Sequence, residues 1–183
     1  AVLRFLEIDE GIEISSLSDV PANTGLGTSS SFIVCLLSAL HAFKGDNPSP
    51  LTLAQEALTI ERDLLEEPGG VQDQYIAAYG GITSLKISKQ GEVDVTPLRI
   101  DPAVLSNLEN RLVFFYTKQQ RVAMEIQGEH VKSIAASDSQ VLESLHEIKS
   151  IGIKSKEAIC VGDLDHYGRL LNDHWNSKKR VSS

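Results

Sequence analysis

The fold of this chain is indicated most clearly by the stretch Pro21-Ala22-Asn23-Thr24-Gly25-Leu26-Gly27-Thr28-Ser29-Ser30-Ser31. Two glycines in this loop are followed at once by four hydroxyl side chains, which open a long apolar segment. Backbone N–H groups and hydroxyls in such a loop attract an anion, and the dipole of the following helix adds positive potential. The stretch therefore predicts a phosphate-binding loop.

This loop differs from the two commonest phosphate-binding motifs. A Walker loop needs a Lys before its Ser or Thr, and no Lys occurs before Lys44. The dinucleotide fingerprint needs a third glycine, and Ser30 fills that position.

The overall composition is typical of a globular protein with one core or two small domains. The 183 residues are 42% hydrophobic and 23% charged, with a net charge of −8. This acidic balance argues against a nucleic-acid partner, because the basic cluster at 178–180 is short and reads as a solvated helix end. No segment reaches the ~20 apolar residues of a membrane span. Cys35 and Cys160 form no metal-type pair, so a reduced cytoplasmic compartment fits best.

The ends of the chain suggest a segment of a longer protein. The sequence begins at Ala1 without Met, and residues 1–9 read as the end of a helix or as an extended segment. It stops at Val181-Ser182-Ser183 without a terminating element.

Periodicity and helix breakers place the elements of the first half. We expect a strand at 11–17, helices at 29–44 and 50–67, a helical turn at 73–79 and a hairpin of strands at 82–88 and 92–98. The helix at 29–44 is apolar on nearly every face and should be buried. Ser49-Pro50 should cap the next helix, which stops at Pro68-Gly69-Gly70.

The second half begins with a predicted domain connection at 99–110. An apolar run at 111–116 predicts a strand that is buried on both faces. Helices follow beyond residue 121, with breaks near 150–152 and at Gly162. This order of elements indicates an α+β fold with two domains, at 1–105 and 106–183, the second of them incomplete.

Glu61 lies in the middle of an apolar stripe of its helix. Apolar residues lie three and four positions before and after it, at Ala57, Leu58, Leu64 and Leu65. An inward carboxylate needs a partner, because burying it unpaired is costly. The partner is either a metal ion or a basic side chain. The alternative is a structural ion pair with Arg4 or Arg62, or a locally exposed helix.

Asp73 follows two glycines and lies at the start of a short helical turn. In one interpretation it is simply the N-cap of that turn. Beside a phosphate-binding loop, the same carboxylate can accept a proton from a hydroxyl nucleophile during phosphoryl transfer. Tyr75 and Tyr79 are interpreted as core or wall residues.

The loop carries more hydroxyl groups than one helix cap requires. Mg²⁺ prefers oxygen ligands, keeps several waters and uses one or two carboxylates. One loop hydroxyl together with Glu61 would satisfy that pattern.

Together these residues resemble the GHMP kinases, the family of galactokinase, homoserine kinase, mevalonate kinase and phosphomevalonate kinase. The family motif Pro-x-x-x-Gly-Leu-Gly-Ser-Ser is matched from Pro21 to Ser29, with Thr28 in place of its first Ser. Glu61 and Asp73, twelve residues apart, fall where the family has a Mg²⁺-binding Glu and a catalytic Asp. The resemblance implies a two-domain kinase architecture without the family's first N-terminal strands and without its C-terminal glycine-rich motif.

The resemblance also implies the roles of individual residues. ATP would contact the loop at Pro21, Asn23, Gly25, Leu26, Gly27, Thr28, Ser29 and Ser30, and Mg²⁺ would be bound by Ser29 and Glu61. Asp73 would be the catalytic residue. The substrate would contact Gly70, Gln72, Tyr79 and Arg121.

Further segments are similar to the D-glycero-D-manno-heptose 7-phosphate kinase branch, with fucokinases as near relatives. These segments are Ile60–Asp63, Gly70–Tyr75, Ala77–Gly81, Phe115–Thr117 and Arg121–Ala123. We therefore expect an ATP-dependent kinase of the anomeric hydroxyl of this small-molecule sugar phosphate, with a homodimer left open.

Three alternatives remain at this point. The first is a fucokinase- or galactokinase-like enzyme of an unphosphorylated sugar, which would lack a second phosphate pocket at Lys118 or Arg121. The second is a non-catalytic sugar or nucleotide sensor on the same fold. The third is a structural domain, which leaves the position of Glu61 unexplained.

Overall fold

The structure, a computed structural model, describes residues 1–21, 24–67, 69–116 and 139–181. The chain divides into two compact units. Among the described residues, the first unit is Ala1–Pro97 and the second comprises 98–116 and 139–181. Within these ranges, no helix is both long enough and apolar enough to cross a membrane.

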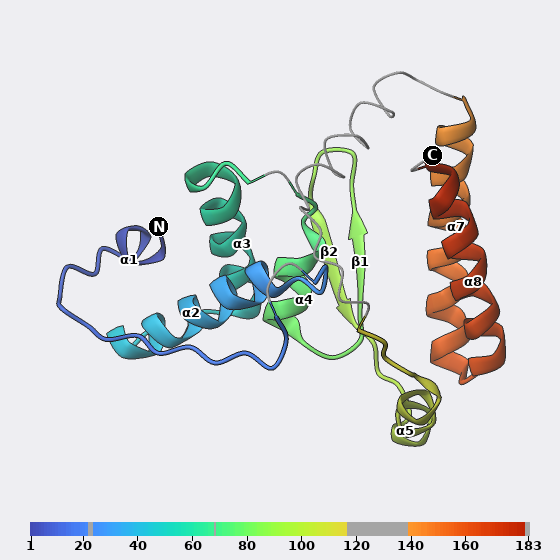
Figure 1. Cartoon of the computed structure of the whole chain (residues 1–183), viewed down its shortest axis with the longest axis horizontal. Coiled ribbons are helices and arrows are strands. Elements are labelled where there is room, and N and C mark those ends of the chain that lie inside the picture. Colours follow the sequence, from blue (N-terminus) through green and yellow to red (C-terminus); the bar gives the residue numbers. More distant parts are fainter. Residues whose placement is uncertain (22–23, 68, 117–138, 182–183) are drawn as a thin grey trace. The chain divides into compact units, whose positions relative to one another are not determined.

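The first unit combines helices with a small antiparallel sheet (Figure 1). Its elements are α1 (Val2–Phe5), α2 (Thr28–Lys44), α3 (Pro50–Thr59), the π-helix η1 (Ile60–Leu64), α4 (Gln72–Tyr79), β1 (Thr83–Ile87) and β2 (Val93–Pro97). β1 and β2 form a hairpin in which Leu85 lies opposite Val95. The predicted α+β class, the helices at 29–44 and 73–79 and the hairpin are confirmed.

The core of the first unit forms where α2, α3 and α4 pack against one another. Its buried apolar side chains are Val2, Leu6, Ile33, Val34, Leu37, Leu40, Leu53, Ala57 and Ile60. Ala77 and Ala78 of α4 pack against this core from the side. Because removal of each large apolar side chain from water contributes about 1.5–3 kcal/mol, this cluster holds the start of α2, η1 and α4 together.

Local sequence sets the ends of α2 and α3. Gly27 and Gly45 bound α2 with φ of 67° and 84°, a backbone conformation that favours glycine. The Ser49 hydroxyl caps α3 by accepting a hydrogen bond from the Thr52 N–H at 3.1 Å, and Pro50 occupies the first turn. The predicted cap at Ser49-Pro50 is confirmed.

Two expectations for the first unit are wrong. Residues 11–17 form no strand. A strand needs a neighbouring edge for its N–H and C=O groups, and the sheet of the described residues consists of β1 and β2 alone. α2 is buried along one stripe and not on nearly every face, since Phe32 and Phe43 are 47% and 59% exposed. α1, α3 and α4 cover one side of this helix in the described part of the chain.

The second unit consists of α5 (Pro102–Arg111), α7 (Ser139–Val161) and α8 (Leu164–Val181). α7 and α8 lie side by side as a helical hairpin (Figure 1), with Ile151, Ala158 and Leu170 in their core. They are joined at Gly162, which has φ of 79°, so the predicted break there is confirmed. Val104 of α5 lies against this turn, because a Cβ on Gly162 would come within 2.9 Å of it.

Three expectations for the second unit are wrong. The predicted connection at 99–110 contains α5, because the Asp101 carboxylate caps it by accepting from the Ala103 N–H at 2.7 Å. Residues 112–116 form no strand and are exposed, since this apolar run meets no sheet among the described residues. α7 continues through 150–152, because the helix interior tolerates Gly152 at a cost of about 1 kcal/mol. The helix expected at 121–138 lies outside the described residues.

Candidate active site

The candidate site lies at the N-terminal end of α2, which α4 contacts (Figure 1). Gly25 and Gly27 of the glycine-rich loop have φ of 77° and 67°. Gly27 is the N-cap of α2, and no described side chain caps the helix or places an acid in its first turn. The first N–H groups of α2 therefore remain open to an anion, which the helix dipole also favours.

The other described residues of the loop differ in exposure. Pro21, Leu26 and Ser29 are exposed, and Thr28 is half-buried at the first position of α2. The Thr24 hydroxyl oxygen is buried without a hydrogen-bond partner among the described residues. Asn23 lies outside the described residues.

Three buried polar side chains meet at the start of α2. Ser30 of α2, Glu61 of η1 and Gln74 of α4 are only 6%, 6% and 4% exposed. The Ser30 hydroxyl donates to Glu61 Oε2 at 3.2 Å. Gln74 Nε2 donates both to Ser30 Oγ, at 3.2 Å, and to Glu61 Oε2. We call this group the Ser30–Glu61–Gln74 cluster.

The cluster holds a buried carboxylate without a described basic partner. Arg62 instead donates to the Gly69 carbonyl at 2.8 Å, and Arg4 is exposed. Glu61 Oε1 and Gln74 Oε1 are buried and have no hydrogen-bond partner among the described residues. The inward position predicted for Glu61 is confirmed, whereas the alternatives of an ion pair with Arg4 or Arg62 are wrong. A buried carboxylate without a basic partner is destabilising, so it favours a cation.

A change of helix type accompanies the inward position of Glu61. Ala54 and Ala57 of α3 are fully buried, and Glu61 continues their stripe. Beyond Glu61, the π turn of η1 shifts the register, so that Leu64 and Leu65 are 50% and 45% exposed. The predicted apolar stripe therefore ends at Glu61.

Asp73 lies against the glycine-rich loop. A Cβ built on Gly27 would stand 3.4 Å from Asp73 Cγ and 3.5 Å from its Oδ2. Asp73 is exposed and lies in the first turn of α4, whose N-cap residue is Val71. The interpretation of Asp73 as the N-cap is therefore wrong, and its carboxylate is available to a molecule bound at the loop.

The predicted substrate residues are placed only in part. The Gln72 side chain lies over Gly70, since a Cβ there would clash with its amide. Tyr79 is half-buried at the end of α4, and Tyr75 is buried one turn before it. Burial raises the pKa of the Tyr75 hydroxyl above its ordinary value, and the nearby Tyr79 hydroxyl raises that pKa further. Arg121 and Lys118 lie outside the described residues.

Sequence reasoning missed Gln74, and it selected Ser29 where the structure brings Ser30 to Glu61. A signal for Gln74 existed. It precedes Ala77 and Ala78 by three and four residues, and both alanines pack against the core. A polar residue on the apolar stripe of α4 is the same anomaly that singled out Glu61.

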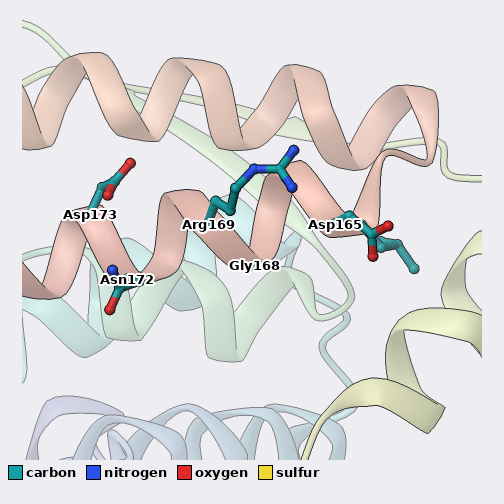
Figure 2. A pocket seen from close by; sticks show the side chains of 6 residues that line it. Asp165, Gly168, Arg169, Asn172 and Asp173 are labelled. Carbon is teal, nitrogen blue, oxygen red and sulfur yellow. The ribbon is translucent and has the colours of Figure 1, made fainter.

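A separate hollow runs along α8 in the second unit. It is lined by Leu164, Asp165, Gly168, Arg169, Asn172 and Asp173. Figure 2 shows that the labelled side chains come from successive turns of this one helix. A binding site requires polar groups that converge on a ligand from several sides. Side chains from one helix alone do not provide this arrangement. The N-terminal end of α2 remains the candidate site.

Comparison with known proteins agrees with this geometry. Residues 1–81 match the GHMP kinases N terminal domain, a range that contains the glycine-rich loop, Glu61 and Asp73. Residues 1–81 therefore form a GHMP kinase N-terminal domain.

The relatives that this chain resembles include sugar kinases. It is 37% identical, over 92% of its length, to a D-glycero-alpha-D-manno-heptose 7-phosphate kinase of Campylobacter jejuni, of which it covers 49%. It is 32% identical, over 94% of its length, to an L-fucokinase/L-fucose-1-P guanylyltransferase of Bacteroides fragilis, of which it covers 18%.

A solved structure is also similar. The crystal structure of a D-glycero-D-manno-heptose 1-phosphate kinase from Bacteroides thetaiotaomicron matches with a TM-score of 0.74 and 29% identity. The match covers 98% of this chain and 52% of that one. The chain thus spans about half the length of the heptose kinases that it matches.

Proposed function

We propose that this chain contributes the phosphoryl-transfer site of an ATP-dependent sugar kinase, which acts on the anomeric hydroxyl of D-glycero-D-manno-heptose 7-phosphate. The observation that carries the proposal is the meeting of three features at the start of α2. These are the open glycine-rich loop, the buried carboxylate of Glu61 and the carboxylate of Asp73 beside Gly27.

The loop would bind the phosphates of ATP. Its described backbone, from Thr24 to Gly27, leads directly into the uncapped first turn of α2. N–H groups and hydroxyls at this position can bind an anion without a lysine. The predicted contacts of Thr28, Ser29 and Ser30 belong to this turn.

The cluster fits a bound Mg²⁺. Glu61 Oε1, which has no hydrogen-bond partner among the described residues, is a hard ligand of the kind that this ion prefers. No group of three or more His, Cys, Asp or Glu assembles within the described ranges, which is compatible with the single carboxylate of many magnesium–nucleotide sites. We assign Glu61 as one ligand and keep Ser29, which directly precedes Ser30, as the second predicted ligand. When bound, Mg²⁺ would neutralise phosphate charge, as a lysine does in a Walker loop.

Asp73 would act on the sugar hydroxyl. Its carboxylate is exposed and lies beside the loop, where it can accept a hydrogen bond from the hydroxyl and take its proton during transfer. Gly70, Gln72 and Tyr79, from α4 and the segment before it, would contact the sugar, and Arg121 would contact its 7-phosphate. We place the reaction in the cytoplasm, which suits the free thiols of Cys35 and Cys160.

A second candidate is a kinase of an unphosphorylated sugar. It is favoured by the L-fucokinase/L-fucose-1-P guanylyltransferase relative, which matches over 94% of this chain. The two kinases differ in the need for a cationic pocket that binds the second phosphate of the substrate.

Turnover of ATP by the whole protein, measured with separate acceptors, tests the proposal. We expect the highest kcat/KM with D-glycero-D-manno-heptose 7-phosphate and lower values with L-fucose and D-galactose. A higher kcat/KM with L-fucose would favour the second candidate. ATP binding without turnover of any acceptor would favour a sensor and would contradict the kinase proposal.

A further inference from the structure

Gln74 is the one member of the Ser30–Glu61–Gln74 cluster that has no role so far. It comes from α4, whereas Ser30 comes from α2 and Glu61 from η1. Its side chain is the most buried of the three, at 4% exposed. We propose that Gln74 is a positioning residue, which orients the Glu61 carboxylate toward the cation and ties it to the turn that carries Asp73. This inference rests on the proposed function.

The hydrogen bonds of the cluster orient the carboxylate. The amide nitrogen of Gln74 donates to two acceptors, Ser30 Oγ and Glu61 Oε2. The Ser30 hydroxyl donates to the same Oε2. One oxygen of Glu61 therefore receives two donors, while Oε1 receives none among the described residues. The carboxylate is held in one orientation with one oxygen left for another ligand.

The orientation of the amide follows from the chemistry of its neighbour. An ionised carboxylate only accepts hydrogen bonds, so the amide nitrogen must face Glu61. The reversed amide would place Gln74 Oε1 against Glu61 Oε2, which is a repulsive contact. Gln74 Oε1 is therefore directed away from Oε2, where it has no partner among the described residues.

A neutral donor suits this position better than a charged one. Lys or Arg at position 74 would neutralise Glu61 and compete with a divalent cation for it. Gln74 supplies two donors and no charge, so the negative charge of the cluster is preserved. Residues that orient a ligand in this way often change metal affinity by about 10–100-fold when they are replaced.

Gln74 also links the two carboxylates assigned to the reaction. It follows Asp73 directly in the first turn of α4, and Asp73 lies 3.4 Å from the position of a Cβ on Gly27. Anchoring Gln74 to α2 and η1 therefore holds Asp73 beside the loop. Loss of the anchor should affect both the cation and the turnover step, because positioning supplies much of the rate enhancement in phosphoryl transfer.

The test uses the whole protein with the substitution Gln74→Met. This change keeps the length of the side chain but removes both hydrogen-bond donors. Gln74→Asn is a second variant, whose amide is one methylene too short to reach Glu61. Gln55→Ala, an exposed glutamine of α3, is the matched control. The readouts are Mn²⁺ affinity by electron paramagnetic resonance with ATP present, kcat, KM for the sugar, and the unfolding midpoint.

We expect Gln74→Met to weaken Mn²⁺ binding by about 10–100-fold and to lower kcat, with KM for the sugar nearly unchanged. Gln74→Asn should show the same loss, and Gln55→Ala should behave as the wild type. A lower unfolding midpoint with unchanged Mn²⁺ affinity and kcat in either variant would overturn the inference, as would a wild type that binds no Mn²⁺. If the wild type turns over no sugar but its Mn²⁺ affinity still depends on Gln74, the kinase proposal fails and the positioning role stands.

Discussion

Each unit of this chain contains a serine and a glutamate held by a third side chain, and the two groups differ in burial and charge. In the first unit, the neutral amide of Gln74 holds Glu61, which is 6% exposed. In the second unit, Ser177 Oγ donates to Glu147 Oε2 at 2.8 Å, and Arg180 forms an ion pair with the same oxygen. The Glu147 side chain is 53% exposed.

This difference in burial and charge distinguishes the candidate site around Glu61 from the structural contact of Glu147. Water and a guanidinium group compensate the charge of Glu147, so the contact on α8 needs nothing further and contributes little stability. The charge of Glu61 lies in a buried cluster whose described donors are neutral. Natural proteins tolerate such a destabilising arrangement mainly where function requires it.

The largest expected effect is that of Asp73→Asn on turnover. The amide cannot take a proton from the sugar hydroxyl, so kcat of the whole protein should fall by about 10²–10⁴-fold. Asp165→Asn is the matched change in the second unit, where the carboxylate is 76% exposed and pairs with Arg111 at 2.6 Å. It should leave kcat unchanged. Equal kcat values for wild type and Asp73→Asn would exclude the catalytic role.

The next effect compares the two glutamates as cation ligands. Glu61→Gln should raise the Mg²⁺ concentration for half-maximal turnover by about 10-fold or more, because the charged ligand is lost. Glu147→Gln should not change this concentration. An unchanged Mg²⁺ dependence in Glu61→Gln would remove Glu61 from the metal site.

The same two variants should differ in stability with opposite signs. Without metal, Glu61→Gln should raise the free energy of unfolding by about 1 kcal/mol, because a buried charge without a basic partner is removed. Glu147→Gln should lower it by less than about 1 kcal/mol, the usual value of an exposed ion pair. Chemical denaturation in the presence of a chelator measures both. A loss of stability in Glu61→Gln as large as in Glu147→Gln would contradict the comparison.

A smaller effect should distinguish the two loop glycines. Gly25 and Gly27 both have positive φ, so an Ala at either position costs about 1–2 kcal/mol of backbone strain. The Cβ at position 27 approaches Asp73, whereas no described residue lies within 4 Å of the one at position 25. Gly27→Ala should therefore lower kcat more than Gly25→Ala, in steady-state assays at saturating ATP. Equal kcat values would show that the contact with Asp73 is unimportant.

The smallest effect concerns the buried tyrosine of α4. The pKa of Tyr75 is raised in the folded chain, so at pH above about 10 the unfolded state loses the proton while the folded state keeps it. Stability should therefore fall as pH rises from about 10, by at most ~1.4 kcal/mol per pH unit from this group. Tyr75→Phe should reduce this change of the free energy of unfolding with pH. Chemical denaturation between pH 9 and 11 measures it, because this range spans the ordinary tyrosine pKa of about 10. An unchanged slope would show that Tyr75 does not cause it.

Local patterns predicted the parts of the fold that local chemistry controls. The cap at Ser49-Pro50, the hairpin of β1 and β2 and the break at Gly162 depend on a few neighbouring residues, and all three are confirmed. The errors concern segments whose state depends on distant partners. The expected strands at 11–17 and 111–116 meet no sheet edge within the described ranges.

For the candidate site, the sequence by itself determined which residues are candidates for the chemistry. Two glycines before a run of hydroxyls, and a glutamate on an apolar stripe, are unusual enough to be recognised from spacing alone. The tertiary structure decided which atoms meet, namely Ser30 and Gln74 with Glu61, and Asp73 with Gly27. Spacing identifies the face of a helix on which a residue lies, but the packing of α2, η1 and α4 determines which side chain that face contacts.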